Sequence, residues 1–276
     1  MISVVIASRG RPELLAQTIE KLQANAVLPD TVIAVALDDD DETMKGFVPS
    51  RGVHVSVAAR EDSIGSKYNR AAALCLADLY LLWADDMAIP TPEWDKKLQY
   101  AADQFTDGYG VLYFGKVDGV FQPGIAVTHK FMDAMGFFNP PWFYFWWADT
   151  WVDEVARLSD KILYVDVAVE LLQPIKGNSR NVKEITFWAE FFDRTRPMRR
   201  LSAEKIIDQS KTPPWRTVQL RQRMPQLEQI LAHRNSKLRD PAQAAQLEAH
   251  FAFDNENSER YERVKAAAVK MLEGVK

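Results

Sequence analysis

The sequence predicts an α/β protein in which a mostly parallel sheet is flanked by helices, with a helical region at the C-terminal end. Over roughly the first 180 residues, short apolar runs alternate with segments of helical periodicity. From residue 181 onward the pattern is helical, and four proline positions are expected to break it: Pro197, Pro213–Pro214, Pro225 and Pro241. We therefore expect a sheet domain over residues 1–180 and a helical appendage over residues 181–276.

The composition indicates a globular protein of a reducing compartment. Apolar residues make up 47% of the 276 residues and charged residues 26%, which excludes a disordered chain. The single cysteine, Cys75, excludes an internal disulfide framework, and the four histidines lack zinc-type spacing. A strand that begins at Ile2 leaves no room for a signal peptide, and no uncharged apolar run of 18 residues is present. We expect a soluble cytoplasmic protein without a transmembrane segment.

The charge is distributed unevenly. Residues 1–179 carry a net charge of −10, residues 180–240 of +7 and residues 241–276 of −1. A basic segment next to an acidic body indicates either a polyanionic partner or a charge match within the protein.

The first strand and helix form a β-loop-α unit. Ile2–Ala7 has the composition of a buried strand, and Pro12 suits the first turn of a helix that continues through Asn25. The loop between them, Ser8-Arg9-Gly10-Arg11, offers two arginines and a glycine to a phosphate or a base. The alternative is that both arginines face water. The loop is not Gly-x-Gly-x-x-Gly, which disfavours a dinucleotide-binding fold.

Acidic residues follow the second strand directly. The strand is predicted over Thr31–Leu37, and Asp38 to Glu42 are five consecutive acids. The first two, Asp38 and Asp39, are expected at the carboxyl end of the strand, where they could hydrogen-bond a base or a ribose. The alternative is a solvated loop.

A third strand, Val53–Ala58, precedes a helix that we expect to begin with Ser66 as its N-cap. Lys67, Asn69 and Arg70 would then lie in its first turn, where cations oppose the helix dipole. A bound anion explains this placement, and an ordinary basic helix start at the surface is the alternative.

The central strand is the organising element. Leu79–Ala84 is apolar throughout, as in a strand buried on both faces of a parallel sheet, and Asp85 and Asp86 follow it before Pro90. Ligands of open α/β sheets bind outside the carboxyl ends of the strands, and paired carboxylates there can hold a divalent cation that bridges phosphate oxygens. The alternative is a solvated turn.

Four further elements complete the predicted sheet domain. They are strands over Val111–Phe114 and Gly124–Thr128, a helix over His129–Met135 that stops at Gly136, and a last strand region over Ile162–Leu172.

The segment 137–147 has the most unusual composition in the chain, because eight of its eleven residues are aromatic. Asp149 and Asp153 follow at an i, i+4 spacing on one face of a helix predicted to continue to Leu158. Aromatic rings beside a carboxylate suit a site that stacks a sugar or a base and needs a general base. The alternative is that the rings pack into the core.

Taken together, these features resemble the GT-A fold nucleotide-sugar glycosyltransferases, especially those of the family 2 type, over roughly residues 1–180. The resemblance is carried by five segments in the family's order: Ser8 to Leu15, Leu37-Asp38-Asp39, Gly65 to Ala72, Ala84-Asp85-Asp86 with Pro90 and Trp94, and Asp149. Two features depart from the family pattern. Ala84 replaces the first acid of the metal-binding Asp-x-Asp, and Leu172-Gln173-Pro174 lacks the histidine that many members place after the last strand.

The resemblance implies a metal-assisted transfer of a sugar from a UDP-sugar donor. The implied nucleotide-binding residues are Ala7, Ser8, Arg9, Arg11, Asp38, Asp39, Lys67 and Asp85. Asp86 would hold Mn²⁺ or Mg²⁺, and Asp149 would act as catalytic base of an inverting reaction, with Asp153 in reserve. The candidate acceptor-binding residues come from composition: Trp142, Trp146 and Trp147 of the aromatic segment, and Lys176 and Arg180 of the polar loop 173–180.

The basic segment suggests the acceptor. Nine of its cations could track a phosphate backbone: Arg194, Arg196, Arg199, Arg200, Lys205, Lys211, Arg216, Arg221 and Arg223. The aromatic segment could hold an extruded base. We therefore predict transfer to a hydroxymethylated base in DNA, as in phage-type DNA glycosyltransferases, in which case the protein would work in the host cytoplasm. The alternatives are a saccharide or lipid-linked acceptor, a non-catalytic nucleotide-sugar-binding protein, and a nucleotidyltransferase.

Overall fold

The chain forms two compact units. The computed structural model describes residues 1–115, 124–144, 146–173, 183–235, 240–251 and 257–274. The first unit comprises residues 1–61, 66–138 and 162–177, and the second comprises residues 62–65, 139–161 and 178–276. The two units interleave along the sequence, so they do not coincide with a division at residue 180. The segment 139–161 groups with the C-terminal helices because its aromatic residues pack among them.

A seven-stranded mixed sheet is the core of the first unit. Its strands are β1 (Ile2–Ala7), β2 (Thr31–Asp38), β3 (Val53–Ala58), β4 (Leu79–Trp83), β6 (Val111–Phe114), β7 (Gly124–Thr128) and β8 (Ile162–Val165), in the order β3-β2-β1-β4-β7-β6-β8. Neighbouring strands are parallel except on either side of β7, which runs antiparallel to β4 and β6. The predicted α/β fold with a mostly parallel sheet is confirmed.

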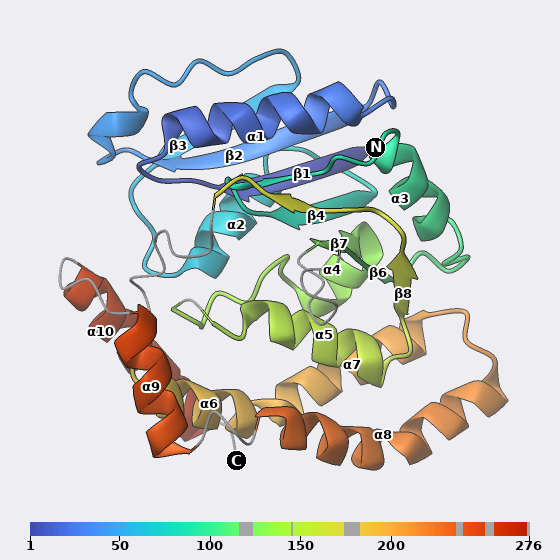
Figure 1. Cartoon of the computed structure of the whole chain (residues 1–276). Coiled ribbons are helices and arrows are strands. Elements are labelled where there is room, and N and C mark those ends of the chain that lie inside the picture. Colours follow the sequence, from blue (N-terminus) through green and yellow to red (C-terminus); the bar gives the residue numbers. More distant parts are fainter. Residues whose placement is uncertain (116–123, 145, 174–182, 236–239, 252–256, 275–276) are drawn as a thin grey trace. The chain divides into compact units, whose positions relative to one another are not determined.

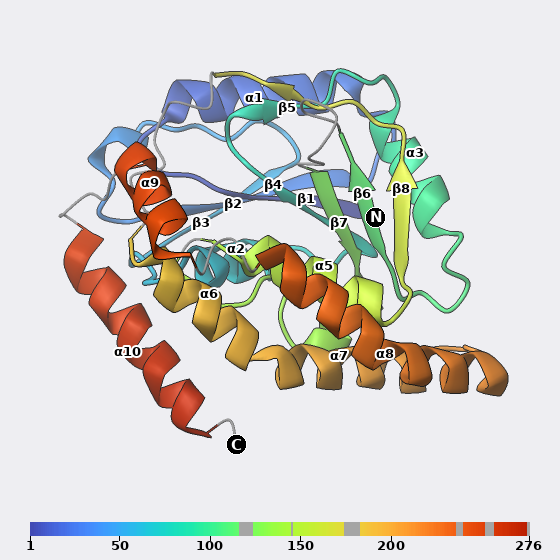
Figure 2. The same ribbon diagram turned by 60° about the horizontal axis from the view of Figure 1, so that its bottom comes forward.

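Helices cover both faces of this sheet. They are α1 (Pro12–Asn25), α2 (Ile64–Ala72), α3 (Trp94–Ala102) and α4 (His129–Met135), and a short 3₁₀ turn, η1, spans Glu42–Met44. Helices α1 and α2 lie on opposite faces, as Figures 1 and 2 show from two directions. Strand β1 lies between two parallel neighbours, and its residues 2–6 are fully buried. This is the reason for its continuous apolar sequence.

Two local predictions were wrong. Helix α2 begins at Ile64, so Ser66 is inside the helix and Arg70 lies in its last turn, where a cation suits the dipole. The last strand region splits in two: β8 joins the main sheet beside β6, whereas β9 (Glu170–Leu171) pairs antiparallel with the short β5 (Met87–Ala88).

The second unit is helical. It contains α5 (Ala148–Leu158), α6 (Ile185–Arg194), α7 (Arg196–Gln209), α8 (Pro214–Asn235), α9 (Pro241–Phe251) and α10 (Ser258–Gly274). Rings from three segments form its core; for example, Phe143 packs on Trp151 of α5 and on Phe191 of α6. The predicted break at Pro225 is wrong, because α8 continues through this residue. Pro214 and Pro241 do mark helix starts, where a proline costs no hydrogen bond.

A close backbone approach within the second unit gives a first prediction. A Cβ on Gly65 would overlap the carbonyl group of Pro140, which is backbone and cannot swing aside. We expect Gly65→Ala to destabilise the protein by roughly 1–3 kcal/mol, as overpacking does, and to lower the Tm measured by circular dichroism. Gly46→Ala is the matched control, since no atom lies within 4 Å of its Cβ position. Equal melting temperatures of the two variants would contradict this packing.

Candidate active site

The strongest candidate site lies at the carboxyl ends of β1 and β4. From β1 the chain passes to β2 and β3 on one side of the sheet and then returns to β4 on the other side. The strand order therefore reverses between β1 and β4, which is where open α/β sheets bind ligands. The loop 8–11 follows β1, and Asp85-Asp86 follows β4, whose Trp83 is in register with Ile6 of β1. The two segments are in contact, because Ser8 and Arg11 of the first segment hydrogen-bond Asp85 of the second.

The turn that carries the two acids is held in place by hydrogen bonds to its backbone. The indole Nε1 of Trp83 donates to the carbonyl of Met87 at 3.0 Å and closes the turn. Thr18 of α1 donates through Oγ1 to the carbonyl of Asp85 at 2.9 Å, and Tyr68 of α2 donates to the carbonyl of Trp83 at 3.1 Å. The carboxylates are thus positioned from both faces of the sheet. Thr18 and Tyr68 could not be recognised from the sequence, because they are 67 and 15 residues from their partners.

Asp85 and Asp86 differ in exposure. The Asp85 side chain is 1% exposed and accepts hydrogen bonds from Ser8 Oγ and from Arg11. Burial raises the pKa of the Asp85 carboxyl, although Arg11 and Ser8 oppose this effect. The Asp86 side chain is 33% exposed, and its Oδ2 lies 3.2 Å from Nη1 of Arg11. One guanidinium group therefore bridges both acids, and Asp86 is the one open to a ligand.

A second ion-pair cluster surrounds Asp38 at the end of β2. The buried Asp38 carboxylate lies 2.8 Å from Nζ of Lys67 and 3.1 Å from Nη1 of Arg9. Lys67 also donates to the carbonyl of Ser8 at 2.8 Å, and burial lowers the pKa of its ammonium group. Asp39, the predicted base reader, is exposed. Lys67 and Asp38 therefore hold the ends of β1 and β2 together. Of the two adjacent acids Asp38 and Asp39, only Asp39 faces solvent.

Two further residues fix the loops of this site. The amide of Gly10, which has a φ of 72°, donates to Asp41 at 2.7 Å, so the loop after β1 is tied to the loop after β2. Arg70 donates to the carbonyls of Leu37 and Ser56 and pairs with Glu61, which links the ends of β2 and β3. At least one acid of the run after β2, Asp41, therefore stabilises the loop after β1 and is not merely solvated.

The predicted catalytic acids are in the second unit. Asp149 is in the first turn of α5, where it accepts a hydrogen bond from the amide of Thr150 at 2.7 Å. Burial raises the pKa of its carboxyl group. Both oxygens of Asp153 accept from Nε of Arg157 at 2.9 Å, one turn further along the helix. Asp153 is therefore paired with a cation of its own helix, and the two predicted acids differ in their surroundings.

The three candidate tryptophans have different surroundings. Trp147 is 4% exposed, with a φ of 70°, and belongs to the core. Trp142 and Trp146 are half-buried; Trp142 packs on Trp151 with ring centroids 5.2 Å apart, and Trp146 packs edge-on against Trp147. Only the two half-buried rings present area that an acceptor could contact. Lys176 and Arg180 lie outside the residues that the structure describes.

Much of the basic segment is matched by acids of the same unit. Arg199 is fully buried on Glu154, so its predicted contact with a phosphate backbone is wrong. Other members form ion pairs: Arg196 with Glu154 and Asp193, Arg200 with Glu204 and Glu228, Arg216 with Asp160, and Arg221 with Asp208. Arg194, Lys205, Lys211 and Arg223 are exposed. The internal charge match that the sequence left open accounts for about half of the cations named.

The donor chemistry of the two acids fits a divalent cation shared with a ligand. Among the described residues there is no group of three or more His, Cys, Asp and Glu side chains that could hold a metal ion. Mg²⁺, however, is commonly bound by one or two carboxylates together with substrate phosphates and water. The partly exposed Asp86 beside Asp85 matches such a site, which a diphosphate would complete.

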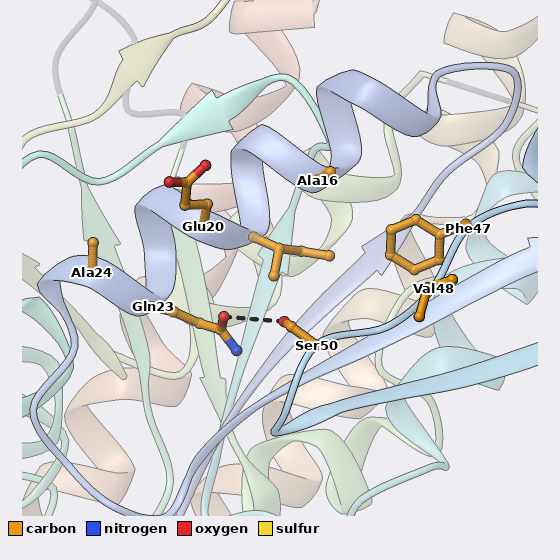
Figure 3. Close-up of a pocket in the computed structure, with 8 residues that line it drawn as sticks. Ala16, Glu20, Gln23, Ala24, Phe47, Val48 and Ser50 are labelled. Atoms are coloured by element: carbon orange, nitrogen blue, oxygen red, sulfur yellow. Dashed lines mark hydrogen bonds between the residues drawn. The ribbon is translucent and has the colours of Figure 1, made fainter.

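A separate cavity of about 460 Å³ lies between α1 and the segment 47–50 (Figure 3). It is lined by Ala16, Ile19, Glu20, Gln23, Ala24, Phe47, Val48 and Ser50, and Ser50 donates to Gln23 across it. Its single charged lining residue is an acid, which makes it unsuitable for a diphosphate. The cluster of cations and carboxylates at the sheet edge remains the better candidate.

The described part of the chain contains no helix with the length and apolar character that crossing a membrane requires. In comparisons with known proteins, no family model matches the chain, and no curated protein matches its sequence.

Solved structures do match. A mannosyltransferase from Pyrobaculum calidifontis, PcManGT, in complex with GDP-Man and Mn²⁺ is similar over 97% of this chain and 84% of its own, with 11% identity and a TM-score of 0.54. Residues 1–349 of S. aureus TarS are similar over 91% of this chain and 79% of that one, with 14% identity and a TM-score of 0.53. The chain therefore has a GT-A-like α/β fold, that of nucleotide-sugar glycosyltransferases, followed by C-terminal helices.

Proposed function

We propose that the protein is a glycosyltransferase that takes its sugar from a nucleotide-sugar donor. One observation carries the proposal: the loop after β1 and the acids after β4 are joined by Arg11 and Ser8 at the point where the strand order reverses. This arrangement places cations, carboxylates and a helix start together, as binding of a diphosphate and its counter-ion requires. The similarity to a mannosyltransferase that holds GDP-Man and Mn²⁺ supports it.

The residues of the first unit would bind the donor. Asp39, exposed at the end of β2, would hydrogen-bond the base or ribose, and the buried Asp38 would hold Arg9 in place. Arg11 and the start of α1 would face the diphosphate, since the free amides of a helix N-terminus attract anions. Ser8 and Lys67 would act indirectly, because their polar atoms already bind Asp85 and Asp38.

Asp86, assisted by Asp85, would hold Mn²⁺ or Mg²⁺. When bound, such an ion neutralises the negative charge that develops on the leaving diphosphate. Arg11 supplies a further positive charge at the same place, so the chain contributes electrostatic stabilisation of its own.

Asp149 would accept the proton of the acceptor hydroxyl as the sugar is transferred. A raised pKa suits this role, because a more basic carboxylate is a better proton acceptor at neutral pH. If the reaction inverts the anomeric carbon, a single displacement by the acceptor hydroxyl is sufficient, and no side chain has to act as a nucleophile. Trp142 and Trp146 would offer ring faces to the acceptor.

The acceptor stays a prediction. A hydroxymethylated base in DNA is the first candidate because Arg194, Lys205, Lys211 and Arg223 are exposed on the helices. The pairing of Arg199 and its neighbours with acids reduces the charge available to DNA. A saccharide or lipid-linked acceptor is the alternative, and it requires fewer cations.

Release of nucleotide from a panel of UDP- and GDP-sugars with Mn²⁺ tests the function. It is measured with plain duplex DNA, hydroxymethylated duplex DNA, oligosaccharides or no acceptor. Release stimulated only by hydroxymethylated DNA would establish the DNA acceptor, whereas release indifferent to DNA would favour the saccharide or lipid-linked alternatives. If the protein bound nucleotide but released none from any donor, it would be a non-catalytic binding protein. Ala84, in place of the first acid of Asp-x-Asp, would explain the loss of catalysis.

A further inference from the structure

Arg11 occupies the carboxylates that the proposed function assigns to the metal ion. Its guanidinium bonds Asp85 through Nη2 and lies 3.2 Å from Asp86 Oδ2 through Nη1. The Arg11 side chain is 27% exposed, so it can leave this position without opening the core. A cation that binds Asp86 and Asp85 therefore has to compete with a positive charge that the chain itself supplies.

The competition is electrostatically strong. Asp85 is buried and Asp86 is partly buried, and charges a few ångströms apart in such surroundings interact far more strongly than in water. While Arg11 pairs with both acids, their combined charge of −2 is half neutralised. A divalent cation gains less from the pair than it would from two free carboxylates.

A bound diphosphate would offer Arg11 another anion. Arg11 is the N-cap residue of α1 and its side chain makes no capping hydrogen bond, so the amides of the first turn and the guanidinium belong to the same short stretch of chain. Helix starts of this kind attract phosphate groups. Movement of Arg11 to the diphosphate would leave both carboxylates free for the cation.

We propose that Arg11 exchanges between Asp85-Asp86 and the donor diphosphate, so that the divalent cation and the nucleotide bind cooperatively. This inference rests on the proposed function, because the diphosphate is the anion that receives Arg11. By thermodynamic reciprocity, the nucleotide tightens binding of the cation by the same factor by which the cation tightens binding of the nucleotide. The exchange would limit occupation of the acids by a cation in the absence of donor.

Mn²⁺ binding without nucleotide tests the first half of the exchange. Free Mn²⁺ is measured by electron paramagnetic resonance during titration of the wild type, Arg11→Gln and Arg9→Gln. Arg9→Gln is the matched control. It removes the same charge from the same loop, but Arg9 pairs with Asp38 and Asp40 and not with Asp85 or Asp86. We expect Arg11→Gln to bind Mn²⁺ roughly tenfold more tightly than the wild type, and Arg9→Gln to remain close to it.

Addition of UDP, and of GDP in a parallel series, tests the second half. Either nucleotide should tighten Mn²⁺ binding strongly in the wild type and roughly tenfold less in Arg11→Gln, where no guanidinium has to move. Because removal of Arg11 leaves buried Asp85 without its cation, Mn²⁺ should also raise the Tm of Arg11→Gln more than that of the wild type. This melting measurement keeps the test informative if the variant is less stable.

The outcomes separate the inference from the function on which it rests. Equal Mn²⁺ affinities of Arg9→Gln and Arg11→Gln, or undetectable Mn²⁺ binding in all three proteins, with a nucleotide bound normally, would overturn the exchange alone. Failure of UDP and GDP to bind any of the three proteins would overturn the proposed function and the exchange with it.

Discussion

Replacing Asp149 with asparagine is expected to lower kcat by about 10²- to 10⁴-fold and to leave binding of the nucleotide unchanged, because general-base catalysis contributes factors of this size. The fold should tolerate the change. The asparagine oxygen can still accept from the amide of Thr150, and burial already disfavours the charged carboxylate. Single-turnover transfer and nucleotide titration on the same preparation measure both quantities.

The neighbouring acid provides the comparison. Asp153→Asn removes a carboxylate from the same helix face, one turn away, but one that Arg157 holds through both oxygens. We expect this variant to retain most of the turnover. If Asp153→Asn lost turnover while Asp149→Asn remained active, Asp153 and not Asp149 would be the general base.

The pH profile gives an independent check on Asp149. The base must be ionised to accept a proton, and burial raises its pKa above the ordinary carboxyl value of about 4. Turnover should therefore fall as the pH decreases through this raised pKa. The residual activity of Asp149→Asn should lack this acid limb.

The second large effect concerns stability. Glu154 of α5 and Arg199 of α7 are 2% and 0% exposed, and Oε2 of Glu154 lies 2.8 Å from Nε of Arg199. Burial raises the pKa of Glu154 and lowers that of Arg199 to about 10, so both charged forms depend on each other. Arg199→Met leaves a buried carboxylate with Arg196 as its remaining cation. We expect a loss of roughly 3–5 kcal/mol in the free energy of unfolding, measured by denaturant titration.

Arg200→Met is the control for this prediction. It removes the neighbouring arginine of the same helix. The ion pairs of Arg200 with Glu204 and Glu228 are partly exposed. Such surface pairs contribute about 0–1 kcal/mol. Removal of both buried charges in Arg199→Met/Glu154→Gln should recover part of the lost stability. A similar loss of unfolding free energy in Arg199→Met and Arg200→Met would show that the buried ion pair contributes no more to stability than the partly exposed one.

The local structure of the first unit followed from the sequence to a large extent. The runs Val53–Ala58, Val111–Phe114 and Gly124–Thr128 were predicted at their observed bounds, and the helix ending at Gly136 has its αL residue there. These elements are set by short-range composition and turn chemistry. The start of α2 at Ile64 was missed because serine is a favoured N-cap residue and glycine a poor helix former, so the sequence favours a start at Ser66.

The candidate site was only partly predictable, for a different reason. The sequence predicted that residues 8–11, 38–39 and 85–86 each follow a strand, and in the structure these strands are parallel neighbours that share one edge. Which side chains pair, however, depends on contacts across tens of residues, such as Ser8 with Asp85 and Lys67 with Asp38. The charge match of the basic segment is hidden for the same reason, because Arg199 finds its partner 45 positions earlier in the chain.

The central claim is that the edge of the sheet binds a nucleotide-sugar through the segments after β1, β2 and β4. Isothermal titration calorimetry of the wild type and of Asp86→Ala with UDP- and GDP-sugars, each with and without Mn²⁺, tests it most directly. We expect saturable binding of one donor molecule per chain that Mn²⁺ tightens in the wild type and not in Asp86→Ala. Absence of binding by every donor, or an Mn²⁺ effect that survives in Asp86→Ala, would contradict the site described.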